Sequence, residues 1–226
     1  MTVCIALLGG SFDPVHHGHV ALARLFAESL RPDELRVLPA RPWQKAGLDA
    51  SDEQRVAMLE LAFADAGLAV TIDLRELEGG SPTYTVDTLR GLRAELGADA
   101  SIVFLMGADQ LQNLDTWRDW RELFALANLG VAARPGYTLE QDALPPAVAH
   151  ELAPRLAPPG QVRTTPAGLV YLAHMLAVDI SATTVRALLK GANADTKAGT
   201  KVDTNVNLLV APVVLDYIQH HNLYKS

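Results

Sequence analysis

The sequence predicts an α/β fold: a Rossmann-like, doubly wound parallel sheet in a single domain, residues 1–226, with a C-terminal helical portion from about 180 to 226. Short apolar runs that suit buried strands alternate with segments whose apolar residues recur at helical spacing, which is typical of a parallel sheet with helices on both faces. Polar clusters follow three of the predicted strands. Ligands of such sheets bind at the carboxyl ends of the strands, so we expect these clusters to converge on one site.

The first half of the chain reads as strands that are each followed by a helix. Strands are predicted at 3–8, 35–38 and 70–74. The first helix is expected to begin near Val15 and to end before Pro32, which cannot continue it. Ser51 and Gln54 form a capping box that begins the second helix. A third helix is predicted over residues 86–96.

The second half continues the alternation and then becomes irregular. Strands are predicted at 102–106, 129–133 and 169–172, and helices at 119–126, 181–189 and 212–221. The proline-rich stretch 144–166 is expected to be mostly loop, with one helix near 148–156. Residues 193–207 are polar and lack periodicity, so we expect a mobile surface loop there.

Composition and charge exclude several classes of protein. A net charge of −7 argues against a nucleic-acid polymer as partner, since a face that tracks phosphates needs clustered Lys and Arg, but not against a small anionic ligand. The single cysteine, Cys4, allows no intrachain disulfide, which favours a reducing compartment. The first apolar run is too short for a signal peptide, and no run approaches the roughly 20 residues of a spanning helix. We therefore expect a cytoplasmic protein with no membrane partner.

The segment GGSFDPVHHGH, residues 9–19, has the composition of a phosphate site. Gly9 and Gly10 let a ligand approach the backbone, and the free N–H groups of the following helix attract anions. His16 and His19, three positions apart, share a helix face, whereas His17 points elsewhere and is expected to be dispensable. Protonated imidazoles would stabilise charge that develops on a phosphoryl group. The histidines could instead bind zinc, but no distant Cys/His cluster completes such a site.

A second segment, ISATTVR at residues 180–186, is a candidate anion site. Ser181 is a plausible N-cap, which puts Thr183 and Arg186 in the first turns of a helix. Hydroxyls, free N–H groups and a guanidinium would then face one anion, such as a triphosphate. Taken alone, the segment is equally well an ordinary capped surface helix.

These two segments resemble the (H/T)xGH and ISxTxxR motifs of the nucleotidylyltransferase superfamily, in the same order. Within it, the form GGSFDPVHxGH resembles the nicotinate-nucleotide adenylyltransferase family. Further segments resemble the same family over nearly the whole chain: SPTYTVDTL, FLMGADQL, TWRDW, ARPGY and VLDYIQHHNLY. One departure lies at 41–45, RPWQK, where Gln44 replaces the usual His, so a basic role of that loop falls to Lys45 alone.

The resemblance implies a reaction and a set of site residues. The adenylyl group of ATP would pass to nicotinate mononucleotide, giving nicotinate adenine dinucleotide and pyrophosphate, with Mg²⁺ neutralising the triphosphate and no other metal site. Assembly into a homo-oligomer is left open. The implied catalytic residues are His16, His19 and Arg186. The implied ATP-binding residues are Gly9, Gly10, Ser11, Phe12, His16, His19, Lys45, Gly107, Asp109, Arg134, Ile180, Ser181, Thr183 and Arg186. Tyr84, Thr85 and Trp117 would hold the pyridine nucleotide.

Alternatives remain at two residues and at the level of function. Trp117 could pack in the core instead of stacking on the pyridine ring, although Trp120 is the more suitable core residue. Asp109 could be a helix N-cap as well as a ribose ligand.

A sister transferase with another phosphorylated acceptor, such as nicotinamide mononucleotide, is the nearest rival function. A non-catalytic nucleotide-binding regulator and a zinc hydrolase are the others.

Overall fold

The computed structural model describes residues 2–41, 48–79, 83–133, 143–173, 180–195 and 206–225. Its strands confirm the predicted order along the chain. They are β1 (Cys4–Gly10), β2 (Glu34–Pro39), β3 (Thr71–Ile72), β4 (Ser101–Gly107), β5 (Asn128–Ala132) and β6 (Val170–Ala173). The predicted strand at 70–74 is wrong in length, because only two of its residues pair with β2 and the chain then turns into a helix.

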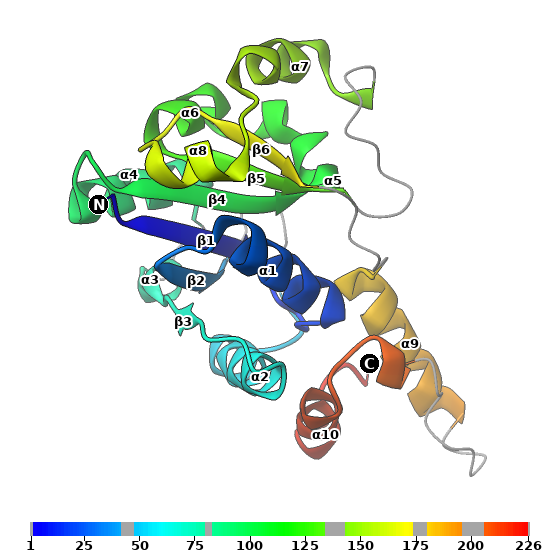
Figure 1. Cartoon of the computed structure of the whole chain (residues 1–226). Helices are drawn as coiled ribbons and strands as arrows, with labels where there is room; N and C mark the ends of the chain where they lie inside the picture. The colour runs from blue at the N-terminus through cyan, green and yellow to red at the C-terminus, as the bar shows by residue number, and fades with distance from the viewer. Residues whose placement is uncertain are drawn as a thin grey trace.

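The strands form one parallel sheet in the order β3-β2-β1-β4-β5-β6 (Figure 1). The order reverses between β1 and β4, where Leu8 lies opposite Leu105. Two loops leave the carboxyl ends of adjacent strands in opposite directions at this switch point and leave a crevice between them. The fold therefore places the predicted polar clusters after β1 and β4 side by side.

Alternate residues of the strands pack into separate cores on the two faces of the sheet. Along β1, Ala6 and Leu8 belong to one core, and Ile5 and Leu7 belong to the other. Burial on both faces explains why the strands read as continuous apolar runs. The first core is covered by α1 (His17–Leu30), α2 (Asp52–Asp65), α8 (Pro159–Thr164), α9 (Ala182–Asp195) and α10 (Pro212–His220). The second is covered by α4 (Thr85–Leu96), α6 (Leu123–Leu126) and α7 (Pro146–Leu152).

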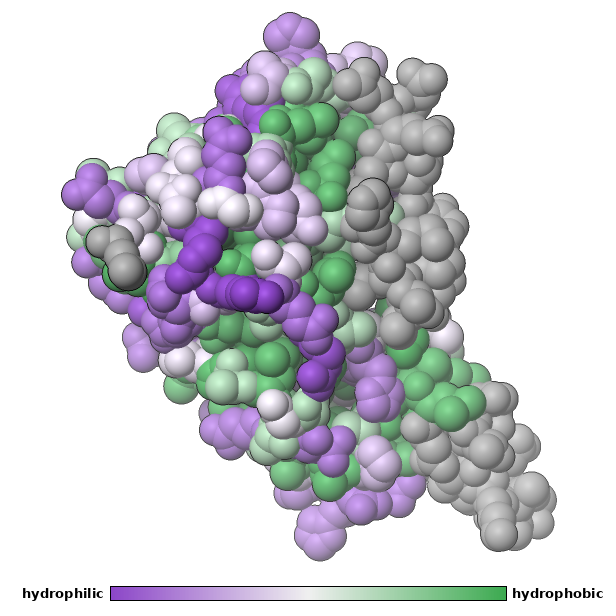
Figure 2. Space-filling model, in the orientation of Figure 1, coloured by the Kyte–Doolittle hydropathy of each residue, from purple (hydrophilic) through white to green (hydrophobic). Residues whose placement is uncertain are grey.

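The outer surface of α1 is polar, as expected for a helix that buries one face. Leu22, Phe26 and Leu30 are buried against the sheet, whereas Arg24 and Glu28 are exposed. Figure 2 shows hydrophilic side chains over this part of the molecule. None of the described helices is both long and apolar enough to cross a membrane.

Short helical segments complete the structure and correct one prediction. They are α3 (Arg75–Glu78), α5 (Ala108–Leu111), η1 (Leu114–Thr116), η2 (Trp120–Glu122), η4 (Ala153–Arg155) and η6 (Val206–Leu208). The stretch 144–166 is wrongly predicted as mostly loop, since α7, η4 and α8 occupy most of it. Each of these helices carries a proline in its first positions, where the missing N–H costs nothing. The prolines therefore begin helices here and do not interrupt them.

Most predicted helix boundaries are confirmed. The capping box is present, with Ser51 Oγ accepting from Gln54 N and Gln54 Oε1 accepting from Ser51 N. The first helix begins at His17, two residues later than predicted, because His16 has an extended backbone and serves as the N-cap. Of the expected loop at 193–207, the first residues end α9 and the last belong to η6, and residues 196–205 lie outside the described residues.

Candidate active site

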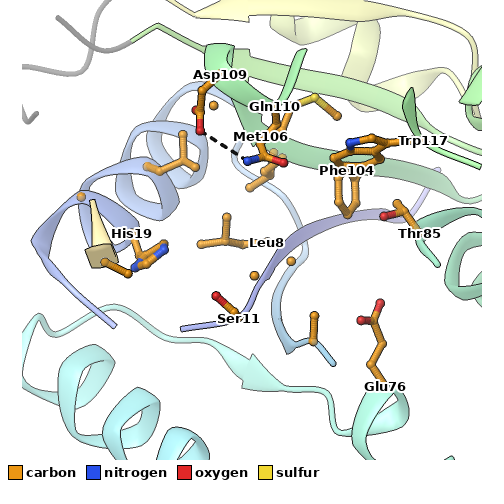
Figure 3. Close-up of a pocket in the computed structure, with 18 of the residues that line it drawn as sticks. Leu8, Ser11, His19, Glu76, Thr85, Phe104, Met106, Asp109, Gln110 and Trp117 are labelled. Atoms are coloured by element: carbon orange, nitrogen blue, oxygen red, sulfur yellow. Dashed lines mark hydrogen bonds between the residues drawn. The ribbon is translucent and has the colours of Figure 1, made fainter. Parts of the chain in front are cut away.

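A cavity of about 400 Å³ lies at the carboxyl ends of β1 and β4, at the switch point of the sheet. Figure 3 shows His19 and Asp109 toward one end of this cavity and Thr85, Trp117 and Glu76 toward the other. The cavity brings together segments that are far apart in the sequence. Predicted site residues that line it are Gly9, Gly10, Ser11, His16, His19, Tyr84, Thr85, Gly107, Asp109, Trp117 and Thr183.

The loop after β1 forms the floor of the cavity and is held from behind by a buried arginine. A Cβ at Gly10 would lie 3.1 Å from the ring of Phe12, so a larger residue at position 10 would crowd this turn. Phe12 is fully buried and does not line the cavity. The guanidinium of Arg55, also fully buried, donates to the carbonyl oxygens of Ser11 (2.7 Å) and Ala40 (2.9 Å). Arg55 thus joins the loops that leave β1 and β2.

The two histidines of the predicted pair lie together at the N-terminus of α1. Their rings stack with centroids 3.7 Å apart, and His19 Nδ1 accepts a hydrogen bond of 3.2 Å from His16 N. The rings of Phe12 and His19 pack in a T-shaped arrangement with centroids 4.8 Å apart. His17 does not line the cavity, and its backbone N–H donates to the carbonyl of Leu209. The arrangement places two imidazoles beside a helix N-terminus, where phosphate oxygens are favoured.

The loop after β4 supplies a carboxylate to the cavity wall. A Cβ at Gly107 would lie 2.5 Å from Asp109 Oδ1, so only glycine at 107 leaves room for this orientation of the carboxylate. Asp109 also accepts from Gln110 Nε2 at 3.3 Å, as the dashed line in Figure 3 shows. The alternative that Asp109 is a helix N-cap is wrong, because α5 begins at Ala108 and Gly107 is its N-cap.

The other end of the cavity is built by the start of α4 and the segment before α6. Tyr84 is the N-cap of α4 and Thr85 its first residue. Trp117 is half-buried and lies edge-on to Phe104 with ring centroids 6.1 Å apart, so part of its ring faces the cavity. Trp120 is the buried core residue, as predicted. The Trp117 ring is therefore available for contact with a planar ligand.

Helix α9 brings the second predicted motif to the rim of the cavity. Ser181 Oγ accepts from Thr184 N at 3.1 Å, which confirms the predicted cap, and Thr183 lines the cavity. Arg186 donates to the carbonyl of Asp13 and lies 3.5 Å from an oxygen of Asp49. Ile180, Ser181 and Arg186 lie outside the cavity lining, and Lys45 and Arg134 lie outside the described residues.

Several lining residues had no signal in the sequence. Glu76, only 9% exposed, accepts hydrogen bonds from Thr83 Oγ1 (2.8 Å) and Thr88 Oγ1 (2.6 Å) at the Thr85 end. Arg118 follows Trp117 directly, and its guanidinium carbon lies 4.9 Å from the centre of the Tyr84 ring. Both residues lie in polar stretches of the sequence, where a charged side chain is expected to be exposed to solvent. In the described part of the chain, no cluster of His, Cys, Asp or Glu is arranged to hold a metal ion.

Comparison with known proteins identifies the family. The cytidylyltransferase-like family model matches residues 7–188. A protein of Herminiimonas arsenicoxydans with the name "Probable nicotinate-nucleotide adenylyltransferase" is 53% identical over 100% of this chain and 99% of its own length. The chain belongs to the nicotinate-nucleotide adenylyltransferase family. Another family member with the same name, from Chromobacterium violaceum, is 45% identical over the full length of both chains.

A solved structure shares the fold of this family member. The Plasmodium falciparum nicotinic acid mononucleotide adenylyltransferase complexed with NaAD has a TM-score of 0.73 and covers 98% of this chain and 97% of its own, at 20% identity. The same enzyme complexed with APC gives a TM-score of 0.72. At this identity the likeness confirms the α/β fold that the sequence predicts. The nicotinate-nucleotide adenylyltransferase assignment itself rests on the full-length relatives.

Proposed function

We propose that this chain transfers the adenylyl group of ATP to nicotinate mononucleotide, giving nicotinate adenine dinucleotide and pyrophosphate in NAD biosynthesis. The observation that carries the proposal is the single cavity that joins the paired imidazoles of His16 and His19 to the Thr85 and Trp117 end. One end suits phosphates and the other suits a flat ring, as a reaction between two nucleotides requires. The names of the full-length relatives support the same activity.

The chemistry needs no nucleophile from the protein. A 5′-phosphate oxygen of the acceptor attacks the α-phosphorus of ATP, the new P–O bond forms, and the bond from the α-phosphorus to its bridging oxygen breaks. The bond electrons leave with pyrophosphate. Catalysis then consists of positioning and of stabilising charge on the phosphoryl oxygens. In our proposal His16 and His19 perform both tasks, with the backbone of Gly9, Gly10 and Ser11 against the phosphates.

The remaining predicted contacts divide between the two substrates. We assign the ribose hydroxyls of ATP to Gly107 and Asp109, since a carboxylate accepts from hydroxyl donors. Thr85, Tyr84 and Trp117 hold the pyridine nucleotide, with Trp117 against the ring. The residues assigned to the phosphate tail are Arg186, Ser181, Ile180, Thr183, Lys45 and Arg134. Phe12 acts on ATP indirectly, through its packing under Gly10 and against His19.

The proposed reaction implies a metal ion, small-molecule partners and a cellular location. Mg²⁺ enters with ATP as part of the substrate and neutralises the triphosphate, so the residues of this chain act on an already complexed anion. The partners are small molecules, ATP and nicotinate mononucleotide. A cytoplasmic location agrees with the sequence expectation of a reducing compartment, because the single cysteine is buried and free.

Pyrophosphate release tests the proposed function. Purified protein with ATP and Mg²⁺ is supplied with either nicotinate mononucleotide or nicotinamide mononucleotide, and kcat/KM is measured for each. We expect the acid form to be the better acceptor. A higher kcat/KM for the amide form would support the sister activity, and no release with either acceptor would overturn the transferase assignment.

A further inference from the structure

One fixed positive charge lines the described part of the cavity. The lining residues with an acidic or basic side chain are His16, His19, Glu76, Asp109 and Arg118, beside the phenol of Tyr84, and among the described lining residues Arg118 is the only Lys or Arg. Arginine stays charged at every working pH, unlike histidine. Its position therefore gives one end of the described cavity wall a permanent positive charge.

Arg118 lies at the end that we assign to the pyridine ring. It follows Trp117 in the chain, and its guanidinium carbon is 4.9 Å from the centre of the ring of Tyr84, the residue before Thr85. This contact holds the guanidinium at the cavity wall, because a cation is attracted to the face of an aromatic ring. The charge is thus kept close to the Tyr84–Thr85 corner.

The protein partners of Arg118 leave its charge open to a ligand. Its contacts with carboxylates are long: 3.4 Å to Asp87 and 3.8 Å to Asp119. Both carboxylates are also paired with Arg90, at 2.7 Å and 3.4 Å. The side chain of Arg118 is 52% exposed. An incoming anion would therefore displace weak contacts and would leave both aspartates with another cation.

The same end of the cavity carries the buried carboxylate of Glu76, visible near Thr85 in Figure 3. The hydroxyls of Thr83 and Thr88, which donate hydrogen bonds to it, are neutral. A second carboxylate nearby is disfavoured unless a positive charge offsets the repulsion. The acid and amide mononucleotides differ in one ring substituent, a carboxylate or a carboxamide, so discrimination between them depends on charge at this end.

We propose that Arg118 determines the preference for the acid acceptor: its guanidinium supplies the positive charge that favours a pyridine carboxylate over a carboxamide beside Glu76. This inference rests on the proposed function and names the residue that sets its substrate class. Arg118 affects which acceptor binds. It does not affect ATP, which we assign to the opposite end of the cavity.

The test compares three variants with the wild type, using nicotinate mononucleotide and nicotinamide mononucleotide as acceptors. In Arg118→Gln we expect the acid-to-amide ratio of kcat/KM to fall about two- to fivefold, as is reasonable for a half-exposed ion pair. The fall should come from a higher KM for the acid form, with the KM for ATP unchanged. Arg118→Lys should retain part of the preference. Added salt should lower the ratio in the wild type more than in Arg118→Gln, because screening weakens exposed charges.

Arg121→Gln is the matched control. Arg121 lies in the same segment and is 60% exposed, but it packs over the Trp120 ring at 4.3 Å and faces Glu151, away from the cavity lining. It should leave the ratio unchanged. An unchanged ratio in Arg118→Gln, or an equal fall in Arg121→Gln, overturns the role of Arg118 and leaves the transferase activity standing. A wild type that does not use the acid form overturns the proposed function itself, so the two failures are distinguishable.

Discussion

His16 and His19 show how one turn of helix can bring two imidazoles together at the wall of the cavity. His16 caps α1 and His19 stands three residues later, so both rings face the same side and stack at 3.7 Å. Gly18 between them is tightly fitted, since a Cβ there would lie 3.0 Å from His16 Nδ1. A side chain at position 18 would therefore crowd the His16 ring. The sequence HHGH thus fixes both the identity of the two groups and their separation.

At this scale we expect His19→Ala to lower kcat about 100-fold or more while ATP affinity changes much less, because a donor aimed at developing charge is lost. Steady-state pyrophosphate release and ATP titration measure the two effects. His17→Ala is the control, since His17 does not line the cavity and should keep wild-type turnover. Unchanged turnover in His19→Ala would remove this imidazole from the mechanism.

Helices α3 and α4 are joined through a single carboxylate. Glu76 of α3 accepts from Thr83, just before α4, and from Thr88, in the first turns of α4. Thr83 N also donates to the carbonyl of Arg41, in the loop that follows β2. Tyr84 and Thr85 lie between these anchors. The position of the Tyr84–Thr85 end of the cavity, which we propose holds the acceptor, is therefore set by contacts between elements.

Glu76→Ala should raise the KM for nicotinamide mononucleotide, whose ring substituent is uncharged and does not sense the loss of the Glu76 charge, severalfold. The KM for ATP should stay nearly unchanged, because the Thr83–Thr88 connection is lost while the proposed phosphate end is untouched. Glu76→Gln keeps an accepting oxygen and should have a smaller effect. Both KM values are obtained from the same pyrophosphate assay. An equal rise in the two KM values would indicate general loosening of the fold and would contradict a local role.

At the scale of the whole molecule, Asp13 joins the loop after β1 to the segment before α2 and to the C-terminal segment. Its buried carboxylate accepts from Asp49 N (2.9 Å), Ala50 N (3.1 Å) and the hydroxyl of Tyr224 (2.7 Å), 211 residues away. Burial, and then the hydrogen bond to Asp13, raise the pKa of Tyr224 well above its ordinary value. The phenol therefore stays protonated and donates at any working pH. This contact fixes the C-terminal segment to the loop that carries the histidines.

Tyr224→Phe should lower the free energy of unfolding by about 1.5–3 kcal/mol, the contribution of a hydrogen bond to a charged group, since a buried carboxylate loses one donor. Urea denaturation followed by circular dichroism measures the change. Tyr217→Phe, in the same C-terminal region but only partly buried, is the control and should stay within about 0.5 kcal/mol of the wild type. Equal stability of Tyr224→Phe and the wild type would contradict this account.

The local chemistry of the sequence was sufficient for most elements. Strands buried on both faces read as apolar runs, and Ser51 with Gln54 shows a helix start directly. The failures occur where position in the fold decides. The strand predicted at 70–74 lies at the edge of the sheet, where only Thr71 and Ile72 pair. The prolines of 144–166 begin short helices because neighbouring elements bury their apolar residues, which no local pattern reveals.

By itself the sequence determined the fold class, through the alternation of apolar runs and helical segments, and the glycine turn and histidine pair after the first strand, because those groups lie within a few residues of one another. Only the tertiary structure decided which distant groups meet them. Arg55, Glu76 and Arg118 are charged side chains in polar stretches, and nothing local separates them from surface residues. They become part of the site only when the parallel sheet brings the ends of its strands together. Which charged residues belong to the site is therefore decided by contacts between the loops at the carboxyl ends of the strands. Helical or strand periodicity does not identify them.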